Sequence, residues 1–206
     1  MKFSVVIPAH NEEVVIASTL DKLLEKLNAS AFEFEILVVA DHCTDGTVQI
    51  LADFAKSDDR IRWIENKGKP GFGMAVRAGF EEYKGDAVAV YMADASDGPD
   101  DLCKYFNRIS KGAECVFGSR FIKGSRVVDY PKHKYFLNRF VNYLIKFLFR
   151  HGLNDTTNAF KCYRRLFYWA ESNYRCLCRT DAGPNARHGC RCLGRFWKIL
   201  SAQCCW

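Results

Sequence analysis

The chain has 206 residues, of which 49% are hydrophobic and 26% charged. This length and composition predict one domain with a sizeable core and exclude two large domains. The opening MKFSVVIPAHNEE holds too short an apolar run for a signal peptide, and no later window offers eighteen uncharged apolar residues. We therefore expect a cytosolic chain that is either soluble or peripheral to a membrane.

The formal charge of +6 is unevenly distributed along the chain. Residues 1–130 carry 16 Lys and Arg against 21 Asp and Glu, whereas residues 131–206 carry 14 against 3. The second part is therefore the one expected to bind anions. Nucleic acid is the least favoured anion, because the acidic first part would repel a phosphate backbone.

Short β-branched runs alternate with amphipathic segments as far as residue 118. The predicted strands are 3–7, 34–39, 61–64, 87–92 and 115–118. Apolar residues between them recur at helical spacing, as in Leu20, Leu23 and Leu27 or in Leu102, Phe106 and Ile109. The alternation predicts an α/β fold with a mostly parallel sheet covered by helices on both faces.

Ionisable or glycine-rich sequences follow every predicted strand, where ligands of parallel sheets bind. They read PAHNEE, ADHCTDGT, ENKGKPGFG, ADASD and SRF. Asp94 directly follows a strand expected to be buried, and the cost of an unpaired carboxylate there would be offset by a divalent cation. The first strand exit has no glycine and no G-x-x-x-x-G-K-[ST] occurs, which argues against a dinucleotide or P-loop site.

The ten cysteines fall into two groups. Cys43, Cys103, Cys115 and Cys162 are scattered, as expected for free thiols in a reducing compartment. The other six lie between residues 176 and 205, spaced C-x-C or C-C with one nearby histidine, His188. This spacing does not favour a zinc site.

Several segments, in order, resemble the family 2 glycosyltransferases, and among them the polyprenyl-phosphate, dolichol-phosphate mannosyltransferase-like branch. They are VVIPAHNEE, ILVVADHCTDGT, GFGMAVRAGF, MADASDGPDDL, FGSRF and DTTNAFKCYRR, spanning about residues 3–165. The resemblance implies a GT-A fold and a nucleotide-diphosphate sugar donor, GDP- or UDP-linked. It also implies Mg²⁺ or Mn²⁺, and a lipid phosphate acceptor at the cytoplasmic face of a membrane.

The resemblance assigns residues to the nucleotide-sugar pocket by position. Pro8, His10 and Glu12 would line it, with His10 standing where relatives often have a tyrosine. Asp41 matches the acidic residue that contacts the base or ribose, although the preceding acid of the usual motif is missing. Ala95 lies in the same pocket by position. The missing acid leaves the base of the donor open.

Three further residues are assigned to catalysis and two to the acceptor. Asp94 matches the first carboxylate of the metal motif, and Asp97 replaces the second, one position later than usual. Arg120 matches the arginine that meets the donor diphosphate. Arg139 and Lys161 would bind the acceptor phosphate. A surface position for Arg139 fits the sequence nearly as well.

A phosphate acceptor removes the need for a general base, because a phosphate monoester is already ionised near neutral pH, its second pKa being ~6. We therefore expect direct displacement with inversion. An alternative is a family 2 transferase acting on a glycan or protein hydroxyl, which needs a base; residues 121–165 offer only Asp129 and Asp155. Another alternative is a catalytically impaired nucleotide-sugar-binding, membrane-associated protein.

The segment 130–153 is predicted to be a basic amphipathic helix. Its apolar residues interleave with Lys132, Lys134, Arg139, Lys146 and Arg150. Such a helix either lies in a membrane interface beside the lipid phosphate or packs on the edge of the sheet, and the sequence does not separate the two.

The chain is predicted to divide into three parts. Residues 1–125 form the GT-A nucleotide-sugar core, and residues 126–165 form the amphipathic helix and acceptor-side segment of the same domain. Residues 166–206 show no strand alternation and a jump in Cys, Arg and Trp. For this tail we weigh an aberrant, out-of-frame translation against a lineage-specific Cys-rich appendage.

Overall fold

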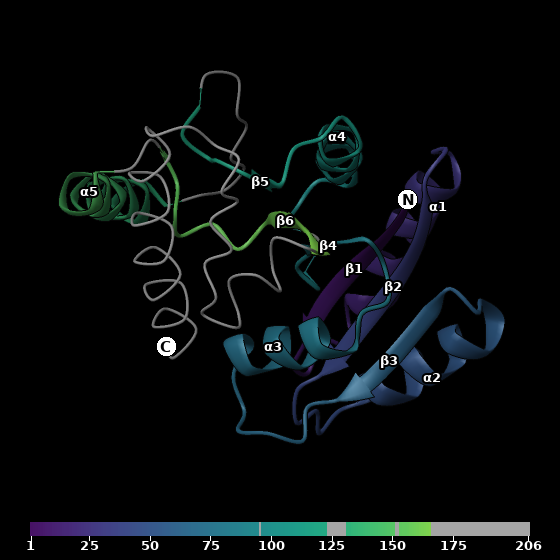
Figure 1. Ribbon diagram of the computed structural model, residues 1–206. Coiled ribbons are helices and arrows are strands. Elements are labelled where there is room, and N and C mark those ends of the chain that lie inside the picture. Colours follow the sequence, from purple (N-terminus) through teal and green to yellow (C-terminus); the bar gives the residue numbers. More distant parts are fainter. Residues whose placement is uncertain (95, 123–130, 151–152, 166–206) are drawn as a thin grey trace.

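The protein is described from a computed structural model, which covers residues 1–94, 96–122, 131–150 and 153–165 (Figure 1). Within them, the predicted alternation of strands and helices is confirmed. Cys43, Cys103, Cys115 and Cys162 are free thiols, as expected. The remaining six cysteines, the tail hypothesis and Ala95 lie outside the described residues.

The described strands form one six-stranded sheet in the order β3-β2-β1-β4-β6-β5. Their bounds are β1 Lys2–Ala9, β2 Glu33–Ala40, β3 Ile61–Glu65, β4 Ala87–Val90, β5 Cys115–Phe117 and β6 Lys161–Arg164. The first four strands are parallel to one another, and β6 runs antiparallel between β4 and β5. The prediction of a mostly parallel sheet is confirmed, but β6 was not among the predicted strands.

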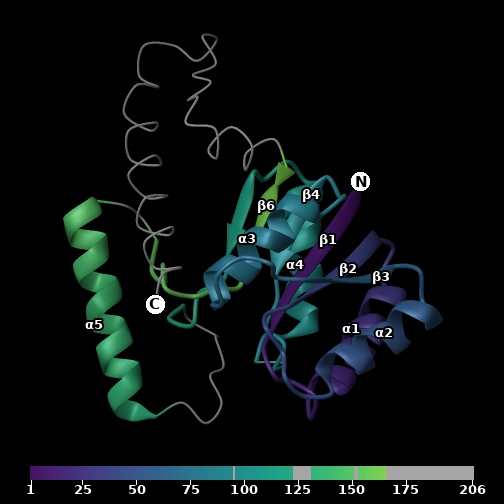
Figure 2. The same cartoon turned by 90° about the horizontal axis from the view of Figure 1, so that it is seen from below.

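Helices cover both faces of the sheet. Their bounds are α1 Ile16–Asn28, α2 Thr47–Ser57, α3 Phe72–Glu82, α4 Pro99–Ser110 and α5 Lys132–Phe149. Successive residues of β1 point to opposite faces, so that Val5 packs in the core under α1, α2 and α4 while Val6 packs under α3. Figure 2 shows α5 set apart from these layers.

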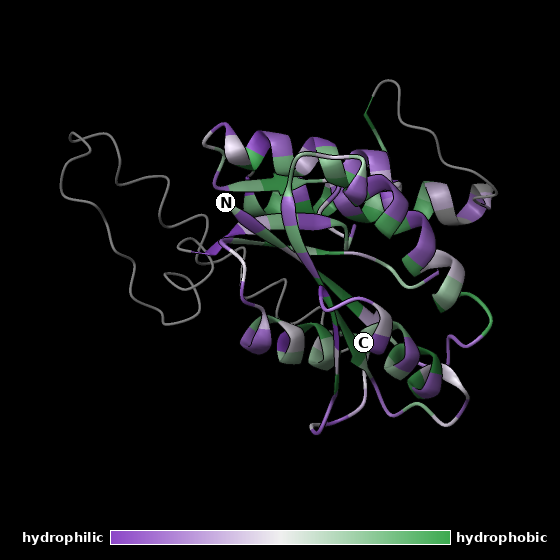
Figure 3. Cartoon of the chain, turned by 90° about the vertical axis from the view of Figure 1, so that its right-hand side faces the viewer, coloured by the Kyte–Doolittle hydropathy of each residue, from purple (hydrophilic) through white to green (hydrophobic). Residues whose placement is uncertain are grey.

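The sheet is apolar throughout its centre. All four residues of β4 are buried, and seven of the eight residues of both β1 and β2 are buried. Figure 3 shows these strands, largely green, between helices that alternate hydrophilic and hydrophobic stretches. Among the described segments, none of the helices is both long enough and apolar enough to cross a membrane.

Helix α3 approaches the sheet closely at Gly79. A Cβ atom built there would collide with Val6 Cγ1 and lie 3.0 Å from Val39 Cγ2. Both valines come from the central strands and are fully buried. The absence of a side chain at Gly79 therefore allows α3 to lie directly on β1 and β2.

We predict that Gly79→Ala destabilises the protein by about 1–3 kcal/mol, because the added methyl group must push α3 away from the sheet. Urea unfolding followed by circular dichroism measures the loss. Gly98→Ala is the control, since a Cβ atom there meets nothing closer than Asp101 Oδ2 at 3.6 Å. Equal stability of the Gly79→Ala variant and the wild type would contradict this packing.

Candidate functional site

The central strand β1 marks a reversal of strand order. From β1 the chain proceeds to β2 and β3 on one side and then returns to its other side with β4. Open parallel sheets bind ligands at such a point, beyond the carboxyl ends of the strands. The pKa of Glu12, after β1, is raised by burial and by the negative charges of Asp94 and Asp45. The loops after β1, β2 and β4 therefore lie close together at this edge of the sheet, where a ligand crevice is expected.

Asp41 organises the crevice at the end of β2. Its carboxylate is buried and accepts hydrogen bonds from Asn66 Nδ2 and the Gly71 backbone N–H, each at 2.7 Å, and from His42 Nδ1 at 3.1 Å. Burial alone would raise the pKa of Asp41, but these hydrogen bonds outweigh it and hold the pKa below its usual value. Asp41 thus joins β2 to the glycine-rich loop after β3.

The predicted nucleotide-pocket residues differ in how they are placed. Exposed His10 donates from Nδ1 to the Asp41 carbonyl oxygen at 2.5 Å, so these two residues are brought together. Glu12 is half-buried, and its backbone N–H donates to Thr47 Oγ1 at 2.8 Å. Pro8 is buried within β1, paired with Val39 of β2. Contact of these residues with a nucleotide stays a prediction.

The loop after β4 carries the two predicted metal ligands. Asp94 is exposed and accepts a hydrogen bond from the Ser96 N–H at 2.9 Å. Asp97 is half-buried, and burial together with the charge of Asp94 raises its pKa to about 6. Two hydroxyls hold the loop: Thr19 donates to the Ala93 carbonyl oxygen at 2.7 Å and Tyr91 to that of Asp97 at 2.6 Å. The loop thus keeps Asp94 close enough to Asp97 for its charge to oppose the ionisation of Asp97.

These carboxylates fit a metal ion that is shared with a diphosphate. No group of three or more His, Cys, Asp or Glu side chains in the described ranges is arranged to hold a metal alone. Mg²⁺, however, is commonly bound by one or two carboxylates together with substrate phosphates. Asp94 and Asp97 provide that number, and a divalent cation would favour the ionised form of Asp97, which burial and the charge of Asp94 disfavour.

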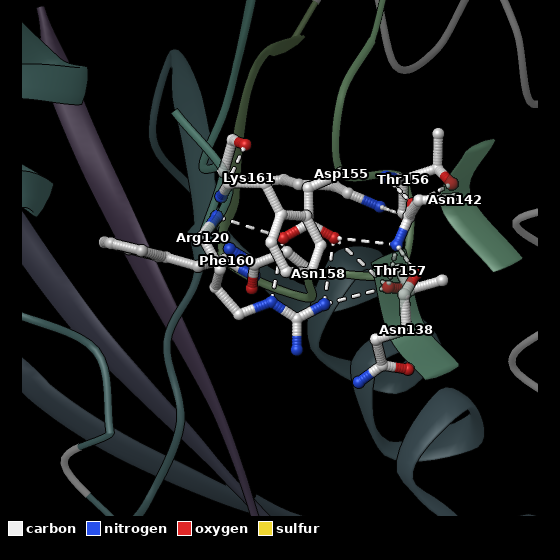
Figure 4. Close-up of polar contacts among 11 residues, drawn as sticks. Arg120, Asn138, Asn142, Asp155, Thr156, Thr157, Asn158, Phe160 and Lys161 are labelled. Atoms are coloured by element: carbon white, nitrogen blue, oxygen red, sulfur yellow. Dashed lines mark hydrogen bonds and ion pairs between the residues drawn. The ribbon is translucent and has the colours of Figure 1, made fainter. Parts of the chain in front are cut away.

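Arg120 is held by a buried carboxylate, as Figure 4 shows. Its Nε and backbone N–H donate to Asp155 Oδ2 at 2.8 and 3.0 Å, and its Nη2 donates to Asp155 Oδ1 at 2.9 Å. Nη2 also donates to Thr157 Oγ1 at 2.8 Å. Burial alone would raise the pKa of Asp155, but the guanidinium outweighs it and lowers the pKa. Arg120 is therefore fixed in orientation, and its positive charge reaches Asp97 as well.

The two residues predicted to bind the acceptor phosphate, Arg139 and Lys161, differ in their exposure. Arg139 of α5 is exposed, with its guanidinium carbon 5.8 Å from the centre of the Phe121 ring. The Arg120 guanidinium carbon lies 5.4 Å from the same ring. Lys161 is buried on β6 and donates from Nζ to the Thr156 carbonyl oxygen at 3.0 Å. The structure brings Arg120 and Arg139 together around one ring, whereas the Lys161 ammonium lies inside the protein.

Asn142 is a member of this cluster that sequence reasoning missed. Its side chain is buried and bonded to the loop that contains Asp155, Thr156 and Thr157 (Figure 4). The only signal in the sequence is one asparagine within the apolar stretch FVNYLI. Such a residue is typical of a helix surface and does not by itself predict a buried contact.

The chain belongs to glycosyl transferase family 2, whose domain matches residues 4–170. It is 32% identical over 165 residues to the polyprenol monophosphomannose synthase of Mycolicibacterium smegmatis, covering 78% of this chain and 61% of that protein. It is also 32% identical over 168 residues to the glycosyltransferase AglD of Haloferax volcanii, covering 80% of this chain and 27% of AglD. The chain therefore spans less than two thirds of the length of these relatives.

The fold is that of the GT-A glycosyltransferases. A solved glucosyl-3-phosphoglycerate synthase from Mycobacterium tuberculosis, in complex with Mn²⁺, UDP-glucose and phosphoglyceric acid, superposes with a TM-score of 0.59. The match covers 80% of this chain and 57% of that one at 17% identity, and so speaks for the fold alone. Fold and family together make this chain a transferase of the glycosyltransferase class.

We predict that Asp97→Asn stabilises the metal-free protein above pH 6. A pKa raised from 3.8 to about 6 means that the ionised carboxylate weakens the folded state, increasingly so as pH rises through this interval. The amide avoids this cost, and two pH units correspond to at most about 3 kcal/mol. Urea unfolding at acidic and neutral pH should show a gain of about 1–3 kcal/mol at neutral pH that disappears near pH ~4.

Asp101→Asn is the matched control, because Asp101 is exposed in the first turn of the neighbouring helix α4. Its substitution should leave no comparable pH-dependent gain. A stability change in Asp97→Asn that did not vary with pH would contradict the burial of an ionised Asp97.

Proposed function

We propose that this glycosyltransferase moves a sugar from a GDP- or UDP-linked donor to a polyprenyl phosphate, with inversion and with the help of Mg²⁺ or Mn²⁺. The similarity to a polyprenol monophosphomannose synthase supports the acceptor class. The observation that carries the proposal is the cluster in which Arg120 and Arg139 share the ring of Phe121 beside the acidic loop of Asp94 and Asp97. The two carboxylates would bind the metal ion, and the two arginines would bind the donor diphosphate and the acceptor phosphate.

The donor diphosphate would bind between the acidic loop and Arg120. Asp94 and Asp97 are the residues that would hold the metal ion, which when bound neutralises charge on the departing diphosphate. The Arg120 guanidinium is oriented in advance by Asp155, so it need not reorganise when negative charge develops on the leaving group. His10 and Asp41 would lie at the nucleoside end of the crevice.

The reaction requires one bond to form and one to break. An oxygen of the acceptor phosphate attacks the anomeric carbon, and the bond from that carbon to the donor diphosphate breaks, with the electron pair leaving on the nucleoside diphosphate. No proton must be removed from the nucleophile, because a phosphate monoester is ionised at neutral pH with its second pKa at ~6. Attack opposite the leaving group inverts the anomeric configuration.

Helix α5 supports a lipid acceptor. Its large apolar side chains are exposed, with Phe136 at 70%, Phe140 at 64% and Phe147 at 71%. The described part of the protein does not cover this face, which disfavours packing against the sheet edge as the role of the helix. Exposed Arg139 and Lys146 lie on the same helix and would attract anionic headgroups. Such a helix would bring the chain to the cytoplasmic face of a membrane.

The rival reaction, transfer to a hydroxyl, has less support. It needs a general base near the acceptor. Asp155 is a poor base, because its carboxylate is fully buried and bonded to Arg120, and because its pKa is lowered. The other candidate, Asp129, lies outside the described residues. The impaired-protein alternative remains distinct, since such a protein would bind a donor without transferring its sugar.

We predict sugar transfer by the purified full chain with Mn²⁺, polyprenyl phosphate and labelled nucleotide sugars, counted as label in the organic phase. Asp94→Asn should lower the rate by at least about a hundredfold, because the diphosphate would lose metal-assisted stabilisation. Asp100→Asn is the control, since Asp100 lies in the first turn of α4 and pairs with Lys26.

Other results would change the assignment. Label on a glycan or protein instead of lipid would favour the hydroxyl rival, and a retained anomeric configuration would rule out direct displacement. Metal-dependent nucleotide binding without transfer from any donor would favour the impaired protein.

We predict that the double variant Phe140→Ser, Phe147→Ser lowers binding to vesicles containing anionic lipid by about tenfold or more, because two exposed aromatic rings no longer enter the interface. Liposome flotation measures the bound fraction. Val14→Ser is the control, as Val14 is 87% exposed but lies outside α5. Wild-type flotation that is absent, or that ignores anionic lipid, would contradict the membrane role.

A further inference from the structure

Helix α5 differs from an ordinary surface helix in which of its residues is most buried. Asn142 is 3% exposed, whereas the large apolar side chains of the same helix point outward. A soluble helix normally buries its apolar stripe and exposes its amides. The contact that holds α5 to the rest of the described protein at this position is therefore polar and directional, rather than a broad apolar interface.

The amide of Asn142 is bonded at both ends. Its Oδ1 accepts from the Thr156 backbone N–H at 2.6 Å and from Thr156 Oγ1 at 2.8 Å. Its Nδ2 donates to Thr157 Oγ1 at 3.0 Å, to Asp155 Oδ1 at 3.4 Å and to the Asn138 carbonyl oxygen at 2.9 Å. Hydrogen bonds depend strongly on direction. This set therefore fixes both the position of α5 along its axis and its rotation about that axis.

The same loop holds Arg120. Asp155 Oδ1 receives both Arg120 Nη2 and Asn142 Nδ2, and Thr157 Oγ1 receives the same two donors (Figure 4). Arg139 precedes Asn142 by three residues, close to one helical turn, and reaches the Phe121 ring that Arg120 also contacts. Asn142 thus bonds the helix that carries Arg139 to the loop that holds Arg120.

We propose that Asn142 is a positioning residue that holds Arg139 at a fixed distance from Arg120, so that an acceptor phosphate binds next to the donor diphosphate. This inference rests on the proposed function, because it concerns the acceptor side of that site. Asn142 itself touches neither phosphate. Its effect passes through the placement of α5, and two negatively charged phosphates need such fixed cations to approach each other.

The test uses the full chain and geranyl phosphate, a short soluble prenyl phosphate whose binding does not depend on a membrane. Isothermal titration should show that Asn142→Ala weakens geranyl phosphate binding on the order of tenfold, while binding of the nucleoside diphosphate with Mn²⁺ changes by less than about twofold. In the transfer assay the KM for the prenyl phosphate should rise more than kcat falls. Asn28→Ala is the matched control, as Asn28 Oδ1 accepts from Arg60 Nη1 at 2.8 Å, away from this cluster.

Asn142→Asp gives a second, independent measurement. It keeps the oxygen that accepts from Thr156 but places a carboxylate against Asp155. Measured relative to the wild type at the same pH, because the phosphate itself loses charge near its second pKa of ~6, its binding of geranyl phosphate should be weak at neutral pH and recover as pH falls and that carboxylate is protonated. Asn142→Ala should show no such recovery. Lys161, Arg120 and Asp155 are the charged groups around this position, and both variants leave them in place.

Wild-type affinity for geranyl phosphate in Asn142→Ala would overturn the inference. So would an equal loss of prenyl phosphate and nucleotide binding together with a lowered melting temperature, which would indicate a general structural role. If the wild type binds geranyl phosphate in an Asn142-dependent way but transfers no sugar, the proposed reaction fails while the positioning role stands. If the wild type binds no prenyl phosphate, the inference is overturned as well.

Discussion

The second half of the described protein depends on one buried carboxylate. Asp155 has no exposed side-chain surface, yet it is ionised, because Arg120 donates to both of its oxygens. A charge of this kind is tolerated away from water only when its partners are complete. The segment after β5, the loop before β6 and helix α5 all supply partners, and they are therefore held together by the need to keep this charge paired.

Charge is separated within the crevice in a way that matches the proposed chemistry. On the donor side, burial and the charge of Asp94 raise the pKa of Glu12 and of Asp97, whereas Arg120 and Arg139 gather around Phe121 on the other side. Keeping like charges close together weakens the folded state, so neither group is expected on grounds of stability alone. A bound metal ion would neutralise the excess negative charge of the carboxylates. Bound phosphates would neutralise the excess positive charge of the arginines.

Membership of glycosyl transferase family 2 and the GT-A fold define the class of reaction, and they leave the acceptor to be argued from the chain itself. The argument for a lipid phosphate combines an exposed apolar face on α5 with the basic residues of the same helix. It also draws on Asp155 being a poor general base, since its buried carboxylate is bonded to Arg120. Because the chain spans 61% of the polyprenol monophosphomannose synthase that it matches, the acceptor remains a proposal.

The sequence by itself determined the elements of the core and the polar ends of its strands. Short β-branched runs predicted β1 to β5, and helical spacing predicted α1, α4 and α5, because these patterns are local and the buried faces are strongly apolar. Motif order was enough to single out Asp41, Asp94 and Asp97 as candidate site residues. The shared crevice then follows from parallel strands, which all end at one edge.

Only the tertiary structure decided how the acceptor side is assembled. The insertion of β6 between β4 and β5 pairs β6 with residues of β4 more than seventy positions away, and the four residues KCYR carry no pattern that predicts it. Likewise, helical periodicity shows that α5 has two faces but not which one is covered. Hydrogen bonds among Asp155, Thr156 and Asn142 decide which face is covered. These residues meet only once the chain is folded, and local sequence patterns contain no information on such long-range contacts.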